Sequence, residues 1–207
     1  MINQTIEHFI NELGSEKSTP GGGSAAAVTG AIGISLTQMV VSLTTGKARY
    51  AEHQTLLDDV QAQATVLTQR FIDGIQEDIA AFNHVMEAYR LPAQTEDEKC
   101  LKQVQIEATS KEATIAPFNM METSVEALRL SQQLLGKSNP NVLSDLGVAA
   151  LNLSAALQSS WLNVLINLKN IQDEAFVSTY RMQGTKLLAE GKQLANELYQ
   201  QVLTELA

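Results

Sequence analysis

Two long stretches without a charged side chain constrain what this chain can fold into. One runs from Ser18 to Gly46 and the other from Leu146 to Leu168. Each is long enough to cross a membrane as a helix, but both contain Ser, Thr, Asn or Gln together with small residues, and are therefore only weakly hydrophobic. A helix that is apolar on all sides can equally lie at the centre of a large bundle. We expect two central bundle helices and no membrane partner.

The composition favours helices over sheets. Ala, Leu, Gln and Glu are abundant and aromatic residues make up only 5% of the 207 residues, which is typical of helical proteins. Apolar residues recur at three- and four-residue steps, with no alternating strand pattern. The sequence therefore predicts an all-α fold of about six helices in one domain spanning residues 1–207. Several of these helices are long and have a face of small residues, which favours a two-fold homodimer.

Capping residues and helix breakers predict where the helices begin and end. Thr95 and Glu98 form a capping box, Pro92 ends the helix before it, and Pro117 is expected to kink the helix that follows. The first helix is short and amphipathic, so it must dock on another surface. The expected helices cover residues 2–13, 24–45, 51–89, 95–136, a segment of nearly thirty residues capped by Ser144, and the segment from Asp173 onward.

Charge and cysteine content exclude several classes of protein. The net charge of -9 argues against a nucleic-acid partner, because such proteins rely on basic surfaces. Cys100 is the only cysteine, which excludes an intramolecular disulfide or a cysteine-based zinc site and fits the reducing cytoplasm. The N-terminus does not resemble a signal peptide. His8, His53 and His84 lack metal-ligand spacing, so we expect a cytoplasmic protein without a metal site.

The segment Pro20-Gly21-Gly22-Gly23-Ser24 is the first candidate for a binding site. Three consecutive glycines are costly to order on folding, and a chain tolerates them where its backbone must approach something closely. Ser24 is a good N-cap for the helix that follows, whose first amides would attract a negatively charged group. The segment is either a flexible turn before a core helix or the wall of a binding site.

Asp78 is a carboxylate on an otherwise apolar helix face. It shares one stripe with Phe82, Val85, Met86 and Tyr89. Such a carboxylate is costly unless it is paired or hydrogen-bonded, and burial raises its pKa. A carboxyl group of this kind can act as a general acid or base near neutral pH. The alternative is that Asp78 pairs with a nearby Lys or Arg, or lies at the solvated end of the stripe.

A polar stripe follows the helix that begins near Ser144. Asp145 and Asn163 are eighteen residues apart, which is five helical turns, so they face the same way. The stripe is either a hydrogen-bond network that fixes helix register or one wall of a polar cavity, and Asp145 also suits the first turn of a helix. The stripe consists of Asp145, Asn152, Ser159, Asn163, Asn167 and Asn170, and the cations next to these features are Lys47, Arg49, Arg90 and Lys111.

Four segments occur in this order along the chain: Pro20-Gly21-Gly22-Gly23-Ser24, Asp78-x-x-Ala81-Phe82 with Tyr89-Arg90-Leu91-Pro92, Ser144-Asp145-Leu146, and Asn163-Val164-Leu165-Ile166-Asn167-Leu168. Together they resemble the formiminotetrahydrofolate cyclodeaminase/methenyltetrahydrofolate cyclohydrolase family, over essentially the whole chain. After Leu91-Pro92 this chain has Ala93 where the family often has Lys, which removes one possible cation for the folate. The segment from Ala116 to Glu122 matches only loosely.

The resemblance implies an all-helical, dimeric enzyme whose substrate is a tetrahydrofolate derivative. In the cyclodeaminase reaction, N10 of 5-formiminotetrahydrofolate attacks the formimino carbon and ammonia leaves. In the alternative cyclohydrolase reaction, water opens the 5,10-methenyl ring to give 10-formyltetrahydrofolate. A helical assembly module without enzymatic activity is the further alternative.

We assign roles to individual residues from their chemistry and placement, within the segments that the resemblance marks. Asp78 would be the catalytic acid and base, and Asp145 would join it in the catalytic set by orienting the substrate. Lys47, Arg49 and Arg90 would anchor the acidic polyglutamate tail of the folate substrate. The other implied substrate-binding residues are Pro20, Gly21, Gly22, Gly23, Ser24, Phe82, Asn163 and Asn167.

Overall fold

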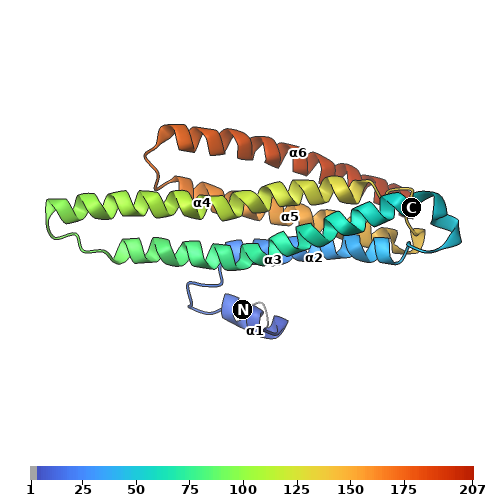
Figure 1. Ribbon diagram of the computed structural model, residues 1–207, viewed down its shortest axis with the longest axis horizontal. Helices are drawn as coiled ribbons and strands as arrows, with labels where there is room; N and C mark the ends of the chain where they lie inside the picture. The colour runs from blue at the N-terminus through green and yellow to red at the C-terminus, as the bar shows by residue number, and fades with distance from the viewer. Residues whose placement is uncertain (1–3) are drawn as a thin grey trace.

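The computed structural model describes residues 4–207 and confirms the all-α prediction, since within that range it holds helices, turns and loops but no strand. Five long helices form an elongated bundle, and a short helix lies beside it (Figure 1). Ile2, which we expected in the first helix, lies outside the described residues. The elements are α1 (Ile6–Leu13), α2 (Gly22–Ser42), η1 (Ala48–His53), α3 (Gln54–Arg90), α4 (Glu96–Gln132), η2 (Pro140–Val142), α5 (Leu143–Leu168) and α6 (Glu174–Leu206).

The two uncharged stretches form α2 and α5, which pack against each other along their length. They run antiparallel, because Gly22 faces Asn163 whereas Gly33 faces Leu153. Among the described residues, α2 is the helix whose length and hydropathy would allow it to cross a membrane, and half of that apolar stretch is buried inside the bundle.

Small residues let α2 approach its neighbours closely. A Cβ on Gly30 would lie 2.6 Å from Cδ1 of Phe71 on α3, well inside van der Waals contact. Phe71 itself is fully buried in the core. The aromatic ring of α3 therefore rests directly on the backbone of α2, and this contact sets the separation of the two helices.

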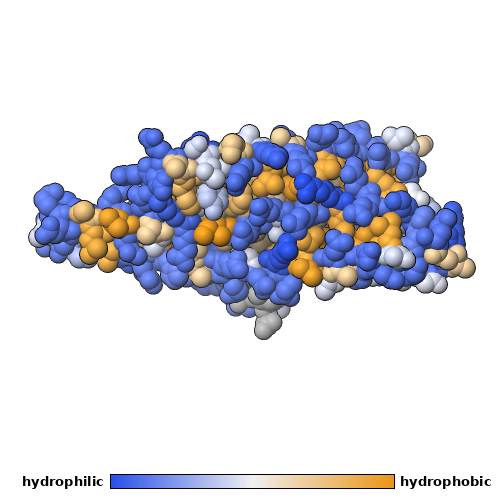
Figure 2. All heavy atoms as spheres, turned by 45° about the horizontal axis from the view of Figure 1, so that its top comes forward, coloured by the Kyte–Doolittle hydropathy of each residue, from blue (hydrophilic) through white to orange (hydrophobic). Residues whose placement is uncertain are grey.

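The hairpin of α3 and α4 protrudes beyond the rest of the bundle at one end (Figure 1). Apolar side chains gather on the surface of this end in Figure 2, where Leu101 and Val104 are both largely exposed. The capping box of Thr95 and Glu98 is present at the start of α4, as predicted. The helix then continues through Pro117 to Gln132.

Two predicted helix starts were wrong. The helix after the glycine segment begins at Gly22 with Gly21 at the N-cap position, so Ser24 lies inside the first turn and does not cap it. The helix that we expected Ser144 to cap begins one residue earlier, at Leu143, because the short η2 helix leads directly into it. Asp173 does cap the last helix, accepting a hydrogen bond from the backbone N–H of Phe176.

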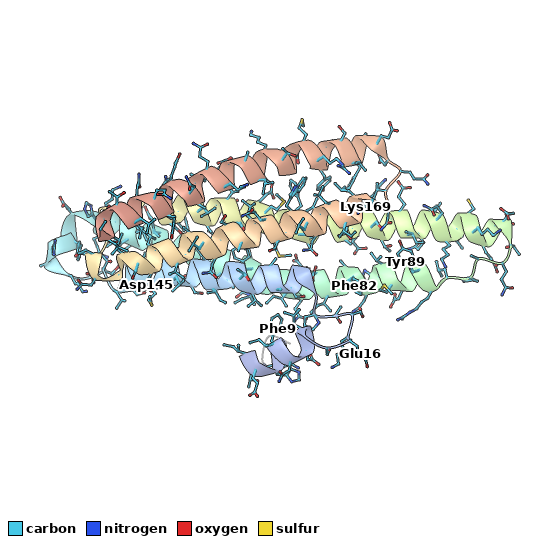
Figure 3. The ribbon with its side chains drawn as sticks, turned by 180° about the vertical axis from the view of Figure 1, so that it is seen from behind. Phe9, Glu16, Phe82, Tyr89, Asp145 and Lys169 are labelled. Atoms are coloured by element: carbon cyan, nitrogen blue, oxygen red, sulfur yellow. The ribbon has the colours of Figure 1, made fainter. Side chains whose placement is uncertain are left out.

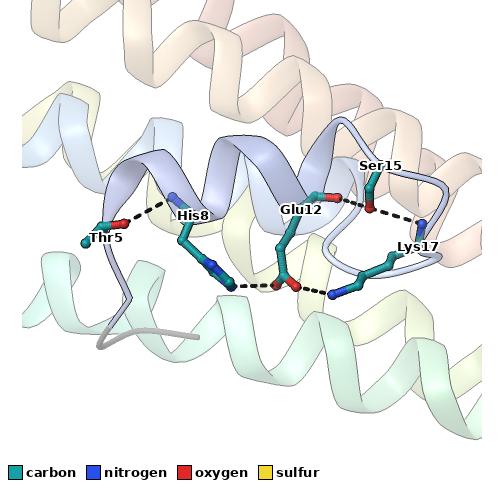
Figure 4. A network of polar contacts seen from close by, with 5 residues as sticks. All are labelled: Thr5, His8, Glu12, Ser15 and Lys17. Carbon is teal, nitrogen blue, oxygen red and sulfur yellow. Dashed lines mark hydrogen bonds and ion pairs between the residues drawn. The ribbon is translucent and has the colours of Figure 1, made fainter.

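Helix α1 is held together by its own polar groups and stands apart from the bundle (Figures 1 and 3). Thr5 accepts a hydrogen bond from the backbone N–H of His8, and Glu12 pairs with both His8 and Lys17 (Figure 4). Ser15 donates to the backbone oxygen of Glu12. Within the described structure, none of the residues of α1 is buried, and Phe9 and Glu12 are only partly covered.

Candidate active site

A cleft of about 420 Å³ opens beside the start of α2, the end of α5 and the C-terminal part of α3. It contains the glycine segment, the Asp78 stripe and part of the polar stripe, three features that the sequence analysis singled out separately. The lining residues are Ser18, Thr19, Gly21, Gly22, Gly23, Asp78, Ala81, Phe82, Val85, Met86, Tyr89, Ala113, Asn163, Ile166, Asn167 and Asn170.

Asp78 is half-buried in this cleft and is hydrogen-bonded to α2. The hydroxyl of Ser24 donates to Oδ2 of Asp78 over 2.9 Å. Burial raises the pKa of Asp78 above its ordinary value, and hydrogen bonds from the hydroxyl and backbone N–H of Ser24 counteract part of that increase. No Lys or Arg among the described residues forms an ion pair with Asp78. The carboxyl group is therefore free to exchange a proton with a ligand.

Gly23 is required because its backbone lies against the carboxyl group of Asp78. A Cβ at position 23 would lie 2.5 Å from Cγ of Asp78 and 2.8 Å from Oδ2, and closer still to Oδ1. Gly23 and Ser24 thus fix the position of the carboxylate from two sides. From the sequence we predicted both as substrate contacts. Their supporting role was not predictable, because only the fold brings Ser24 next to Asp78, 54 positions further along the chain.

Two asparagines on α5 line the cleft, and each donates an amide N–H to a backbone oxygen. The Nδ2 of Asn163 donates to the backbone oxygen of Ser159 over 2.9 Å, and the Nδ2 of Asn167 donates to that of Ala113 over 2.7 Å. Each carboxamide oxygen then remains able to accept a hydrogen bond from a ligand. Asn163 also lies next to Gly22, where a Cβ would be 3.6 Å from its amide.

The rest of the cleft is largely apolar. Phe82, Val85, Met86 and Tyr89 come from one face of α3, and Ile166 comes from α5. Figure 3 shows Phe82 and Tyr89 on the same stretch of α3. A flat ring system suits such a wall, because apolar side chains cover its faces while the acceptor groups bind its edge.

The cleft accepts hydrogen bonds but offers no positive charge. Its lining residues, all within the described part of the chain, include no Lys or Arg, and Asp78 is their only acidic group. Such a site favours a ligand that carries N–H donors or a positive charge.

Three of the residues expected in the site lie far from this cleft. Asp145 is eighteen residues from Asn163 on the same helix, which separates them by about 27 Å, and Figure 3 shows it toward the other end of the bundle from Phe82. Lys47 and Arg49 follow the far end of α2, about 30 Å from Gly22. Lys47 donates to the backbone oxygen of Leu43, and Arg49 lies over the ring of Tyr50. A single chain does not bring these three residues to Asp78.

The remaining expected residues adjoin the cleft or are engaged elsewhere. Arg90 is exposed and directly follows the lining residue Tyr89 at the end of α3. Pro20, in the loop that leads to Gly21, is buried. Lys111 pairs with Asp173 and Glu107. No group of three His, Cys, Asp or Glu residues placed to hold a metal occurs among residues 4–207.

Comparisons with known proteins agree with this geometry. The family model for formiminotransferase-cyclodeaminase matches residues 5–186. The methenyltetrahydrofolate cyclohydrolase of Methylorubrum extorquens is 38% identical over 204 residues, which cover 99% of this chain and 98% of that protein. The formimidoyltransferase-cyclodeaminase of Sus scrofa is 31% identical over 196 residues, and the match covers 93% of this chain but only 36% of that longer protein.

A solved structure extends the likeness to the fold. The crystal structure of formiminotetrahydrofolate cyclodeaminase from Thermotoga maritima aligns with a TM-score of 0.81 at 28% identity, covering 99% of this chain and 96% of the other. The resemblance inferred from four short segments is thereby confirmed. The chain belongs to the formiminotransferase-cyclodeaminase family of folate enzymes.

Proposed function

We propose that this chain acts on the carbon that bridges N5 and N10 of a tetrahydrofolate derivative, with Asp78 as its general acid and base. The observation that carries the proposal is the acceptor-rich cleft around a partly desolvated carboxyl group without a neighbouring Lys or Arg. In 5,10-methenyltetrahydrofolate the bridging carbon and its two nitrogens share one positive charge. A carboxylate and two amide oxygens stabilise such a cation.

The cyclohydrolase reaction is the first candidate. Water attacks the bridging carbon while Asp78 accepts one of its protons. The bond from carbon to N5 then breaks, N5 takes up a proton from Asp78, and 10-formyltetrahydrofolate remains, with one proton released overall. The relative with 38% identity, matched over nearly all of both chains, carries the cyclohydrolase name and favours this reaction.

The cyclodeaminase reaction is the second candidate, because the solved relative that shares the fold over nearly the whole chain is a cyclodeaminase. N10 attacks the carbon of the formimino group, whose nitrogen is protonated, and passes its own proton to Asp78. Asp78 then donates that proton to the departing nitrogen, which leaves as ammonia and closes the methenyl ring. Both reactions need one group that accepts and then returns a proton at the same carbon.

The other cleft residues would bind and orient the substrate. Asn163 and Asn167 would accept hydrogen bonds from the N–H groups of the pterin ring, and Phe82 would pack against its face. The backbone from Pro20 to Gly23 forms the wall beside Asp78 and keeps the reacting carbon close to the carboxyl group. Arg90, which follows Tyr89 at the rim, is the cation placed to meet the acidic tail.

We further propose that the protein is a cytoplasmic homodimer. An acidic chain with one exposed cysteine suits the cytoplasm, and exposed apolar side chains such as Leu151 and Leu162 on α5 suit a second copy. Asp145 would then have a structural role, since a carboxylate in the first turn of α5 complements the helix dipole. Lys47 and Arg49 would contribute to tail binding only if another copy brought them to the cleft.

One pair of assays tests the proposed function. Purified protein is incubated separately with 5-formiminotetrahydrofolate and with 5,10-methenyltetrahydrofolate, while the methenyl absorbance and free ammonia are followed. Loss of methenyl absorbance supports the cyclohydrolase, and its appearance together with ammonia supports the cyclodeaminase. Turnover of neither substrate contradicts both reactions and favours the non-enzymatic assembly module.

Asp78→Asn separates the chemistry from binding. The variant should lose at least about 100-fold in turnover, as is typical when a general acid or base is removed, while it retains substrate binding. The exposed carboxylate Glu77 is the neighbouring residue outside the cleft, so Glu77→Gln is the matched control. Near-normal turnover in Asp78→Asn would remove Asp78 from the mechanism.

A further inference from the structure

We propose that Pro117 is a positioning residue for the cleft. It leaves the backbone oxygen of Ala113 free to hold the amide nitrogen of Asn167, so that the carboxamide oxygen of Asn167 is the atom offered to a ligand. This role rests on the proposed function and deepens it, because it names what orients one of the substrate-binding groups. Pro117 itself does not line the cleft, whereas Ala113 and Asn167 both do.

Pro117 interrupts the hydrogen-bond ladder of α4 next to the cleft. It is buried in the interior of this helix of 37 residues. Proline has no backbone N–H, and its ring crowds the carbonyl group four residues earlier. In α4 that carbonyl belongs to Ala113. The helical hydrogen bond from position 117 therefore cannot form, and the oxygen of Ala113 needs another donor, because a buried carbonyl without a partner is costly.

Asn167 on α5 supplies that donor. Its Nδ2 donates to the backbone oxygen of Ala113 over 2.7 Å, across 54 positions of the sequence. A carbonyl oxygen only accepts, so the nitrogen of the carboxamide must face Ala113. Nitrogen and oxygen belong to one flat group, and holding the first fixes the second. Within residues 4–207, Oδ1 of Asn167 is neither paired nor enclosed, and it is therefore available to a ligand.

Asn163, the other asparagine of the cleft, is held in a different way. Its Nδ2 donates to the backbone oxygen of Ser159 over 2.9 Å, four residues earlier in the same helix. That oxygen also receives the helical hydrogen bond from the backbone N–H of Asn163, and no proline takes part. Only Asn167 depends on a carbonyl that a proline has released, so Asn163 provides an internal control.

The helix itself gives no reason for a proline at this position. Proline is the least favourable residue in a helix interior, and alanine at position 117 would restore the missing hydrogen bond. The other three prolines of the chain, Pro20, Pro92 and Pro140, lie outside the α-helices. A residue that contradicts its local structure is expected where function requires it. The released carbonyl beside the cleft supplies that requirement.

Neighbouring contacts hold the released carbonyl in place. Ala113 packs with Ala81 and Val85 of α3, which also line the cleft. Lys111, two residues earlier on α4, pairs over 2.9 Å with Asp173, the cap of α6. This part of α4 is thus fixed against α3 and against the start of α6. A binding group is oriented reliably only when its support is held in this way.

The orientation of Asn167 decides which ligand edge the cleft prefers at this point. With Oδ1 free, the residue binds an N–H group and rejects a carbonyl. In Pro117→Ala the restored N–H would compete for the oxygen of Ala113, and the carboxamide could turn and offer its nitrogen instead. Pro117 therefore favours the N–H groups of a ring such as the pterin without touching the ligand.

Steady-state kinetics of Pro117→Ala give the first test. KM for the preferred folate substrate should rise about three- to tenfold, the range expected for one hydrogen bond. The value of kcat should stay within about twofold, because this contact is made before and during the reaction alike. The melting temperature should be unchanged or higher, since alanine suits a helix interior better than proline. An unchanged KM in the folded variant overturns the proposal.

Double variants separate positioning from a general effect on the helix. In an Asn167→Ala background, Pro117→Ala should raise KM no further, because the group on which it acts is gone. In an Asn163→Ala background it should raise KM by the same factor as in the wild type, since independent effects multiply. A factor that persists in the Asn167→Ala background overturns the proposal.

Nuclear magnetic resonance of the full chain, labelled with ¹⁵N-asparagine, tests the contact without any turnover. The side-chain amide signal of Asn167, identified by its loss in Asn167→Ala, should shift in Pro117→Ala, and that of Asn163 should not. Pro117→Val restores the same N–H at nearly the volume of proline and should reproduce the shift. An Asn167 signal that moves in neither variant overturns the proposal. A shift in a chain that turns over no folate supports the positioning role and contradicts the proposed function alone.

Discussion

Replacing Gly23 with alanine would push a methyl group into the carboxyl group of Asp78. The new Cβ would lie 2.5 Å from Cγ of Asp78, whereas carbon atoms in contact are separated by about 3.5 Å. The carboxyl group must therefore retreat by about 1 Å. A displacement of that size at a reacting group costs about 100-fold in rate, which corresponds to about 2.7 kcal/mol.

The assay for Gly23→Ala is turnover of the preferred folate substrate, measured together with substrate binding and thermal unfolding. Gly74→Ala is the matched control, since Gly74 is also buried inside a helix but a Cβ there would lie 3.4 Å from Cγ of Met120. The control should keep normal turnover. Normal turnover in Gly23→Ala with an unchanged pH profile would refute the inference that Gly23 positions Asp78.

Three further predictions follow from individual contacts. Ser24→Ala removes the hydroxyl hydrogen bond that lowers the pKa of Asp78 and keeps the one from the backbone N–H, so the Asp78 limb of the profile of kcat/KM against pH should move to higher pH. Asp78→Asn should raise the melting temperature at neutral pH. In the folded state the pKa of Asp78 is raised above its ordinary value of 3.8. Between those two pKa values the folded state binds more protons than the unfolded state, so the stability of the wild type falls as pH rises. The difference in melting temperature between Asp78→Asn and the wild type should vanish below about pH 3.8. A difference that does not depend on pH would contradict this prediction. Thr95→Ala deletes the capping box of α4 and should lower the free energy of unfolding by about 1 kcal/mol, as measured in urea.

The helix content and the unusual position of Asp78 on an apolar helix face were predictable, because each depends on local periodicity. A carboxylate among Phe82, Val85 and Tyr89 on one stripe is visible without any knowledge of the fold. The start of the helix at Gly22 was not predictable in the same way. Ser24 has the side chain of an N-cap, but its hydroxyl bonds Asp78, and this tertiary contact overrides the local preference.

The expected association of Asp145 with Asn163 shows what helical periodicity leaves out. Residues separated by whole turns share a direction around the helix axis, but their separation along the axis grows by about 1.5 Å per residue. Only the packing of α2 against α5, and of α3 against α2, decides which part of the polar stripe faces a cleft. The same rise puts Lys47 and Arg49, which follow the C-terminal end of α2, about 30 Å from Gly22, and their assignment to the site overlooked that separation.

Because the ring of Phe71 rests on Gly30, the size of the side chain at position 71 sets the separation of α2 and α3. Phe71 lies two helical turns, about 10 Å, from Asp78 on the same helix, and its ring rests on the α2 backbone. A smaller side chain at position 71 would let the helices approach, and a larger one would force them apart. Either change would alter the solvation of Asp78 without touching the cleft. The proton affinity of the proposed catalytic group can thus be tuned from the core, by a residue that no substrate contacts.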